Sequence, residues 1–254
     1  MDKLEIKDLF GLEPYGQIGL EVTKASIAAV SSFLKTVFKP GLEEVGYLLK
    51  DQIRMWRLNN ILRILEKAQG RMCFDGKELS LTANPRVGLA IMEEGSAVDD
   101  EGLQDLWAGL FVSSCTPDGR DDSNMNFVDL LRRMSSVEAR ILDYACRNSK
   151  KLIFPNQLIL ANELVVPFDE LARVAGSTDV YRLDNELDHM RSIQLFADGG
   201  AFGDSGGFSA SDKLDANITP SALALSLFYK THSTGQSPAE FWGDSLTPVN
   251  LDQS

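Results

Sequence analysis

The chain has 254 residues, of which 44% are hydrophobic and 24% charged, and its formal net charge is -12. This composition is that of an ordinary globular protein, long enough for one large core or two small ones. The acidic surplus repels phosphate backbones, so a nucleic-acid function would need a local basic patch. The three cysteines are widely spaced and odd in number, which disfavours a disulfide framework or zinc site and predicts a cytoplasmic location.

No targeting or membrane-spanning segment is predicted. The first eight residues are charged throughout and lack the apolar stretch of a secretory signal. The longest weakly charged stretch, 22–38, is interrupted by Lys24 and Lys35 and falls short of the roughly 20 apolar residues that a spanning helix needs. A membrane role is therefore restricted to an amphipathic helix on the surface, with a buried or partner-facing helix as the alternative.

The first part of the chain predicts an irregular lead-in over 1–20 and a helical domain over 21–148. Glycine and proline residues disfavour regular structure in the lead-in, whereas apolar residues recur at helical spacing after it. Asn84 with Pro85, the carboxylates at 99–101 and a Ser135–Glu138 capping box mark helix starts, and Gly70 marks a helix end. The predicted helices cover 22–38, 42–69, 85–94, 99–114, 124–134 and 136–147.

The second part predicts a winged-helix-like domain over 149–232, followed by a disordered acidic tail over 233–254. Three helices, a strand, a glycine-rich loop, a strand and a helix follow one another, which is the order of a winged helix-turn-helix. The fold class is thus mainly α, with a small antiparallel β wing and no parallel sheet. The predicted elements are helices at 157–164, 169–174 and 179–191, a strand at 193–196, a loop at 198–207, a strand at 217–218 and a helix from Thr219 and Pro220 to 232.

No catalytic site, metal site or cofactor is predicted. His189 and His232 are the only histidines, and neither has histidine, cysteine or carboxylate neighbours at metal-ligand spacing. Both are interpreted as surface or cap residues. Alternating carboxylates at Asp184, Glu186 and Asp188 diverge around a helix, which predicts a solvated face.

Two tryptophans lie at apolar helical positions and are predicted to be core anchors. These are Trp56 and Trp107. The glycine-rich loop lacks the lysine and the following helix of a phosphate-binding loop, so it is interpreted as a wing tip.

The helix over 42–69 is the predicted contact surface. Between Lys35 and Arg71 eight basic residues stand against four acidic ones, in a chain that is otherwise acidic. Either the helix docks on the protein's own acidic surface, or it meets an anionic partner such as a membrane. An asparagine pair adds hydrogen-bonding groups to an otherwise apolar and basic helix. The contact candidates are Arg54, Arg57, Asn59, Asn60, Arg63 and Lys67.

Two segments carry a family resemblance. Trp56-Arg-Leu-Asn-Asn60 and Asp99-Asp-Glu-Gly-Leu-Gln-Asp-Leu-Trp-Ala-Gly-Leu110, followed by the Leu-Arg-Arg-Met-Ser-Ser-Val-Glu junction, resemble the Abi-alpha (abortive infection alpha) family over roughly 15–232. The resemblance implies a bacterial protein associated with abortive infection, the sacrifice or arrest of a phage-infected cell. The family has no catalytic motif to carry over.

Two classes of function follow. The first is a non-enzymatic anti-phage protein that acts through a protein partner or an anionic membrane surface, with a homo-oligomer left open. The second is a winged-helix regulator that binds nucleic acid. Residues 150–232 hold seven basic and eleven acidic residues, and the predicted recognition helix carries Asp184, Glu186 and Asp188, which disfavours nucleic acid.

Overall fold

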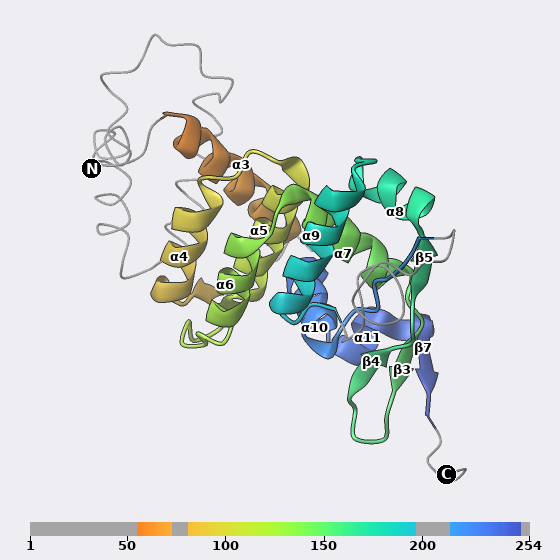
Figure 1. The fold of residues 1–254 in the computed structure, drawn as a ribbon. Coiled ribbons are helices and arrows are strands. Elements are labelled where there is room, and N and C mark those ends of the chain that lie inside the picture. The colour runs from red at the N-terminus through yellow and green to blue at the C-terminus, as the bar shows by residue number, and fades with distance from the viewer. Residues whose placement is uncertain (1–54, 73–80, 197–213, 250–254) are drawn as a thin grey trace, which may run out of the picture. The chain divides into compact units, whose positions relative to one another are not determined.

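The computed structural model describes residues 55–72, 81–196 and 214–249, and the fold is mainly α (Figure 1). Contacts divide the chain into two compact units, Met1–Arg132 and Arg133–Ser254. The division precedes the predicted boundary at 148, because the helix of residues 136–148 packs on helices of the second unit. The predicted lead-in, the helix at 22–38, the loop at 198–207 and Arg54 lie outside the described residues.

The first unit is built from four described helices. Leu62 and Leu65 from the first helix, Ile91 from the second and Trp107 and Phe111 from the third are fully buried together in its core. The first helix packs on the third along its length, and a short antiparallel pair joins Thr82 to Thr116. The elements are α3 (Met55–Met72), β1 (Thr82–Ala83), α4 (Pro85–Gly95), α5 (Glu101–Ser113), β2 (Cys115–Thr116) and α6 (Met125–Arg133).

Helix starts in this unit follow the predicted caps. Asn84 Oδ1 accepts from the Arg86 amide at 3.0 Å ahead of Pro85, and Asp100 Oδ1 accepts from the Leu103 amide at 3.0 Å. These side chains satisfy amides that a helix start leaves without partners. The predicted end at Gly70 is wrong, since α3 continues to Met72. A glycine typically ends a helix by adopting a left-handed conformation itself, and Gly70 has no positive φ.

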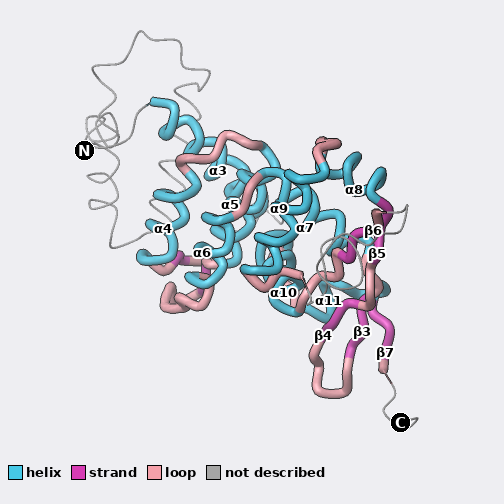
Figure 2. Tube along the Cα trace, viewed as in Figure 1, coloured by secondary structure: helices cyan, strands magenta, loops and turns pink. Residues whose placement is uncertain are grey.

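The second unit packs helices on α7, and its strands form two small sheets (Figure 2). Contacts of α7 reach α8, α9 and α10, and the capping box predicted at Ser135 and Glu138 is present. The elements are α7 (Ser136–Asn148), β3 (Lys151–Ile153), β4 (Ile159–Ala161), β5 (Val165–Pro167), α8 (Phe168–Ala175), α9 (Val180–Ser192), β6 (Asp215–Asn217), α10 (Ala222–His232), α11 (Pro238–Trp242), η2 (Gly243–Ser245) and β7 (Leu246–Pro248).

The winged-helix-like arrangement stays a prediction, because strands interrupt the expected succession of helices in this unit. The strands β3, β4 and β5 lie between α7 and α8 in the chain. After α9, β6 pairs antiparallel with β5, so that Val166 faces Ala216. The predicted strand at 193–196 is reduced to one bridge between Phe196 and Pro220. Thr219 is not the cap of the last helix, because Ser221 Oγ accepts from the Ala224 amide at 3.1 Å instead.

A second sheet contradicts three predictions. Its order is β4-β3-β7, and β3 pairs antiparallel with β4 but parallel with β7. The predicted helix at 157–164 is wrong because Gln157 adopts a positive φ of 68° in the hairpin turn before β4. The prediction of no parallel sheet is also wrong, because β3 and β7 pair in parallel. The predicted disorder of 233–254 is wrong for 238–248, which forms α11, η2 and β7.

Candidate functional site

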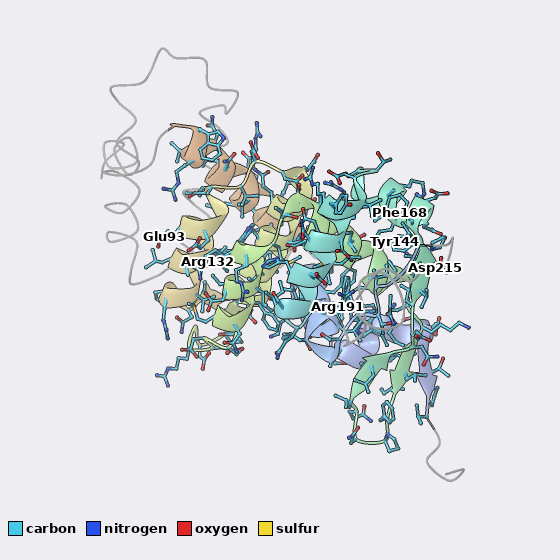
Figure 3. The ribbon with its side chains drawn as sticks, in the orientation of Figure 1. Glu93, Arg132, Tyr144, Phe168, Arg191 and Asp215 are labelled. Carbon is cyan, nitrogen blue, oxygen red and sulfur yellow. The ribbon has the colours of Figure 1, made fainter. Side chains whose placement is uncertain are left out.

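The start of α3 is tied to the end of α4. Arg57 Nε donates to Ser96 Oγ at 2.8 Å, and its terminal nitrogen donates to the Glu93 carbonyl at 3.0 Å. Asn60 is buried and donates to the Ser96 carbonyl at 3.0 Å. Figure 3 shows Glu93 on the α4 ribbon. Two of the predicted contact residues therefore hold a neighbouring helix of their own unit.

The end of α3 is tied to α5 through charge. Lys67 Nζ lies 2.8 Å from Asp105 Oδ1 and 3.7 Å from a Glu101 carboxylate oxygen. Arg71 reaches the same Asp105 oxygen at 3.5 Å. Burial lowers the pKa of Arg71, while Asp105 opposes that change. These contacts support the intramolecular account of the basic helix.

The remaining contact candidates are not brought together by the structure. Arg63 has an exposed side chain, and Asn59 is half-buried with its Oδ1 lacking a hydrogen bond among the described residues. Trp56 is 48% exposed, so its prediction as a core anchor is wrong: it lies in the first turn of α3, ahead of the turns that pack on α5. Trp107 is fully buried, and its prediction is confirmed.

A polar bowl of about 440 Å³ opens between the start of α7 and one face of α9. At its base Glu138 is 1% exposed and accepts from the Ser135 amide at 2.8 Å. His189 Nδ1 lies 2.5 Å from Glu138 Oε1, and Ser135 Oγ donates to Glu186 Oε2 at 2.7 Å. The lining residues are Arg133, Ser135, Glu138, Asp179, Tyr181, Arg182, Asn185, Glu186 and His189.

The bowl corrects the interpretation of His189 as an incidental residue. The spacing of 182, 185, 186 and 189 places these side chains on one face of α9, and α7 supplies the carboxylate that His189 contacts. Burial raises the pKa of Glu138, although hydrogen bonds from Ser135 and His189 lower it. Sequence reasoning found the Ser135–Glu138 cap but had no local signal for a histidine 51 residues away.

The geometry of the bowl does not match that of an activated serine. The Ser135 hydroxyl donates to Glu186 and accepts from the Glu138 amide, and the contacts of the described residues include none between Ser135 and His189. A serine nucleophile requires its proton to be taken by a neighbouring base. The two cysteines in the described residues are no better placed, because burial raises the pKa of Cys115 to about 12 and raises that of Cys146 as well.

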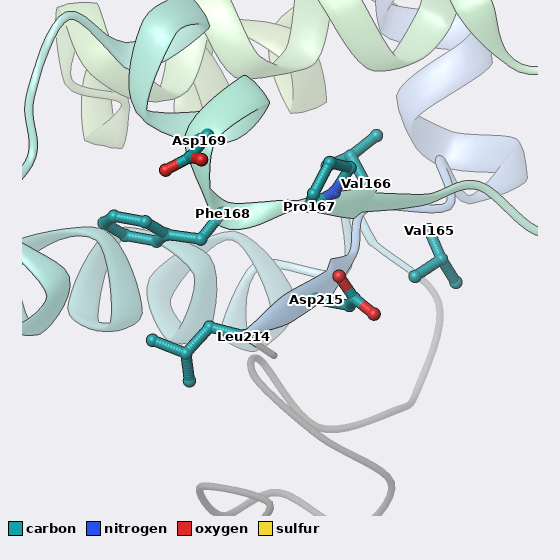
Figure 4. A pocket seen from close by; sticks show the side chains of 7 residues that line it. All are labelled: Val165, Val166, Pro167, Phe168, Asp169, Leu214 and Asp215. Atoms are coloured by element: carbon teal, nitrogen blue, oxygen red, sulfur yellow. The ribbon is translucent and has the colours of Figure 1, made fainter. Parts of the chain in front are cut away.

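A groove of about 600 Å³ follows the β5–β6 ribbon (Figure 4). Val165, which is 50% exposed, and Asp215 lie along its ribbon side, and Phe168 and Leu214 lie at its other end. The groove is thus apolar with carboxylates at its margin. The lining residues are Val165, Val166, Pro167, Phe168, Asp169, Leu214 and Asp215.

Over 55–72, 81–196 and 214–249, no three histidine, cysteine or carboxylate side chains are grouped so as to hold a metal ion. Within the same ranges, none of the helices has the length and apolar content needed to cross a bilayer.

Comparison with known proteins gives one match. The family model described as abortive infection alpha matches residues 57–219, which is more than half of the chain. The chain belongs to the abortive infection alpha family. Neither the curated proteins nor the solved structures yield a match. The matched part of the abortive infection alpha chain begins at Arg57, contains both ties of α3 and the whole polar bowl, and ends at Thr219.

Proposed function

We propose that this member of the abortive infection alpha family acts against phage as a non-enzymatic protein, through contacts with a protein partner. Family membership associates it with abortive infection. The observation that carries the choice of a protein partner is the pairing of the basic helix within its own unit. Lys67 and Arg71 contact Asp105, and Arg57 contacts Ser96 and Glu93. These cations stabilise the fold and are less available to an anionic surface.

The non-enzymatic part of the proposal is supported by the way polar groups in the bowl satisfy one another. The imidazole of the bowl, His189, is held by a contact with Glu138. An infection assay with His189→Gln tests this, because a glutamine amide can still donate to Glu138. We expect the variant to keep plaque protection, with thermal melting as the control for folding. Loss of protection by a fully folded variant would overturn the non-enzymatic proposal.

The partner itself is tested by cross-linking in living cells. We expect a discrete cross-linked species, identified by mass spectrometry, that rises on infection. Size-exclusion chromatography of the purified chain separates a second copy of the protein from a foreign partner. Cross-linking that yields no species above the uninfected background, in cells that are nonetheless protected, would contradict the proposal.

Membrane-surface contact is the competing mode, and half-exposed Trp56 next to Arg57 at the start of α3 is the feature that favours it. Amphipathic helices with aromatic and basic residues bind at the lipid interface. Co-sedimentation with anionic and neutral vesicles at low and high salt separates the modes. We expect no sedimentation with either lipid; binding restricted to anionic vesicles and weakened by Arg63→Glu, whose side chain is exposed, would favour the membrane instead.

A further inference from the structure

Residues 237–249 form a strap that lies outside the part of the chain matched by the family model. The strap begins with a capping box at Ser237 and contains α11, η2 and β7. Its strand β7 pairs parallel with β3, so that Leu152 faces Thr247, and the Val249 amide donates to the Ile153 carbonyl at 3.0 Å. The strap therefore occupies the edge of β3 that β4 leaves open.

The aromatic residues of the strap lie on an aromatic surface of α10. Trp242 stacks on Phe228 with ring centroids 5.4 Å apart, and Phe241 meets Tyr229 edge-on at 5.6 Å. Trp242 also lies against Lys151 of β3, whose Nζ is 4.6 Å from the centroid of the indole ring. The strap thus makes main-chain contacts to β3 and ring contacts to α10.

The strap covers a lysine whose ammonium group has no ion-pair partner among the described carboxylates. Lys151 is 2% exposed, and its Nζ donates to the Arg147 carbonyl at 3.4 Å. None of the carboxylates in the described part of the chain forms an ion pair with it, and burial lowers its pKa. The cation–π contact with Trp242 offsets part of the desolvation that a buried ammonium suffers. Exposure of Lys151 to water would remove that cost.

The strap itself buries little. Neither α11 nor η2 contains a buried residue, and the β7 residues are half-buried or exposed. A segment with few buried apolar contacts opens at a small cost in free energy. Two opposing contributions therefore set how long the strap stays closed. Ring stacking favours the closed form modestly, and the desolvation of Lys151 opposes it.

We propose that the β3 edge, together with Lys151 and Phe228, is a docking site for an extended segment of a partner protein that carries an aromatic side chain, and that the strap occupies this site until the partner displaces it. The occupant is inferred from the strap, which shows what the surface accepts: a parallel strand and an indole ring. Strand addition to an open sheet edge is a common mode of peptide recognition. The proposal rests on the proposed function, because it assigns the surface at which a protein partner is bound.

A peptide with the sequence of residues 237–249 tests the proposal. Labelled peptide is titrated into the full-length wild type and into the full-length Trp242→Ala variant, and fluorescence anisotropy reports binding. We expect the variant to bind the peptide about tenfold more tightly, because its own strap occupies the site for less of the time. A matched peptide with Phe241→Ala and Trp242→Ala should bind neither chain.

Lys151→Met should have the opposite effect on peptide binding. It also keeps the proposal testable if Trp242→Ala fails to fold. Methionine fills the same space without an ammonium, so the strap should stay closed longer. We expect slower hydrogen exchange of the Val249 amide and about tenfold weaker peptide binding than in the wild type. Equal peptide binding by all three chains, or faster exchange in Lys151→Met, would overturn the proposal. This readout needs no infected cell, so its failure leaves the cross-linking test of the protein partner standing.

Discussion

Trp107 lies in the core of the first unit, where it is fully buried and its indole nitrogen has no hydrogen-bond partner among the described residues. Trp107→Ala should lower the free energy of unfolding by about 3–5 kcal/mol, the usual cost of removing a large buried aromatic side chain. Urea denaturation measures the loss. Trp56→Ala is the matched control, because Trp56 is half-exposed and its removal should change stability little. Similar losses for both variants would contradict the buried role of Trp107.

Titration of Glu138 should make the free energy of unfolding depend on pH. Because burial raises its pKa in the folded state, the folded carboxyl keeps its proton to higher pH than the unfolded one. Its contribution to the free energy of unfolding is therefore present at acid pH and lost as the pH rises through the raised pKa. Glu138→Gln cannot titrate, so the variant should gain stability relative to the wild type over that window. Urea denaturation across acid to neutral pH checks this, and a constant difference would contradict it.

The ties of α3 to its neighbours belong to the element scale. Asn60 is buried and donates to the Ser96 carbonyl, so Asn60→Ala leaves that carbonyl without its partner. We expect a loss of about 1–3 kcal/mol in the free energy of unfolding. Asn59→Ala is the control, because Asn59 Oδ1 makes no hydrogen bond among the described residues. Thermal melting of the two variants is the measurement, and a greater loss for Asn59→Ala would reverse the assignment of their roles.

Helices that begin at a capping side chain could be predicted from the sequence. Strands that form only by pairing with a segment far along the chain could not. The caps at Asn84, Asp100 and Ser135 lie within a few residues of the helices they open, so their pattern is visible in a short window. The strand at Leu246–Pro248 has three residues and acquires its structure by pairing with Lys151–Ile153. A short polar segment with prolines gives no strand pattern of its own.

The candidate site likewise depends on contacts between residues far apart in the sequence, which sequence patterns do not reveal. Arg57 and Lys67 were identified as notable because of their charge, but their partners Ser96 and Asp105 lie 39 and 38 residues away. Whether such a helix binds its own unit or a partner depends on the tertiary fold. His189 and Lys151 gave no signal for a comparable reason: each is distinguished by its contact with a residue of another element, Glu138 in the first case and Trp242 in the second.

At the scale of the whole molecule the net charge of -12 governs nucleic-acid binding. Helix α9, the predicted recognition helix, carries Asp184 and Asp188, and both lie near Arg191. We expect the protein to bind duplex DNA no more than weakly, since acidic groups repel the phosphates and a binding protein needs many lysine or arginine contacts to release counterions. Fluorescence anisotropy with labelled duplex at low and physiological salt checks this. Saturable binding that persists at physiological salt would favour the regulator instead.

The parallel pairing of β7 with β3 joins segments that are synthesised far apart in time. Long-range pairings form late, because the entropy of closing a long loop opposes them until the contact is made. The hairpin of β3 and β4 leaves the ribosome well before residues 246–248, so the edge of β3 stands unpaired during that interval. An unpaired strand edge is a template for another chain. Newly made protein is therefore the form in which this edge is most exposed to capture, whether by a partner or by misassembly.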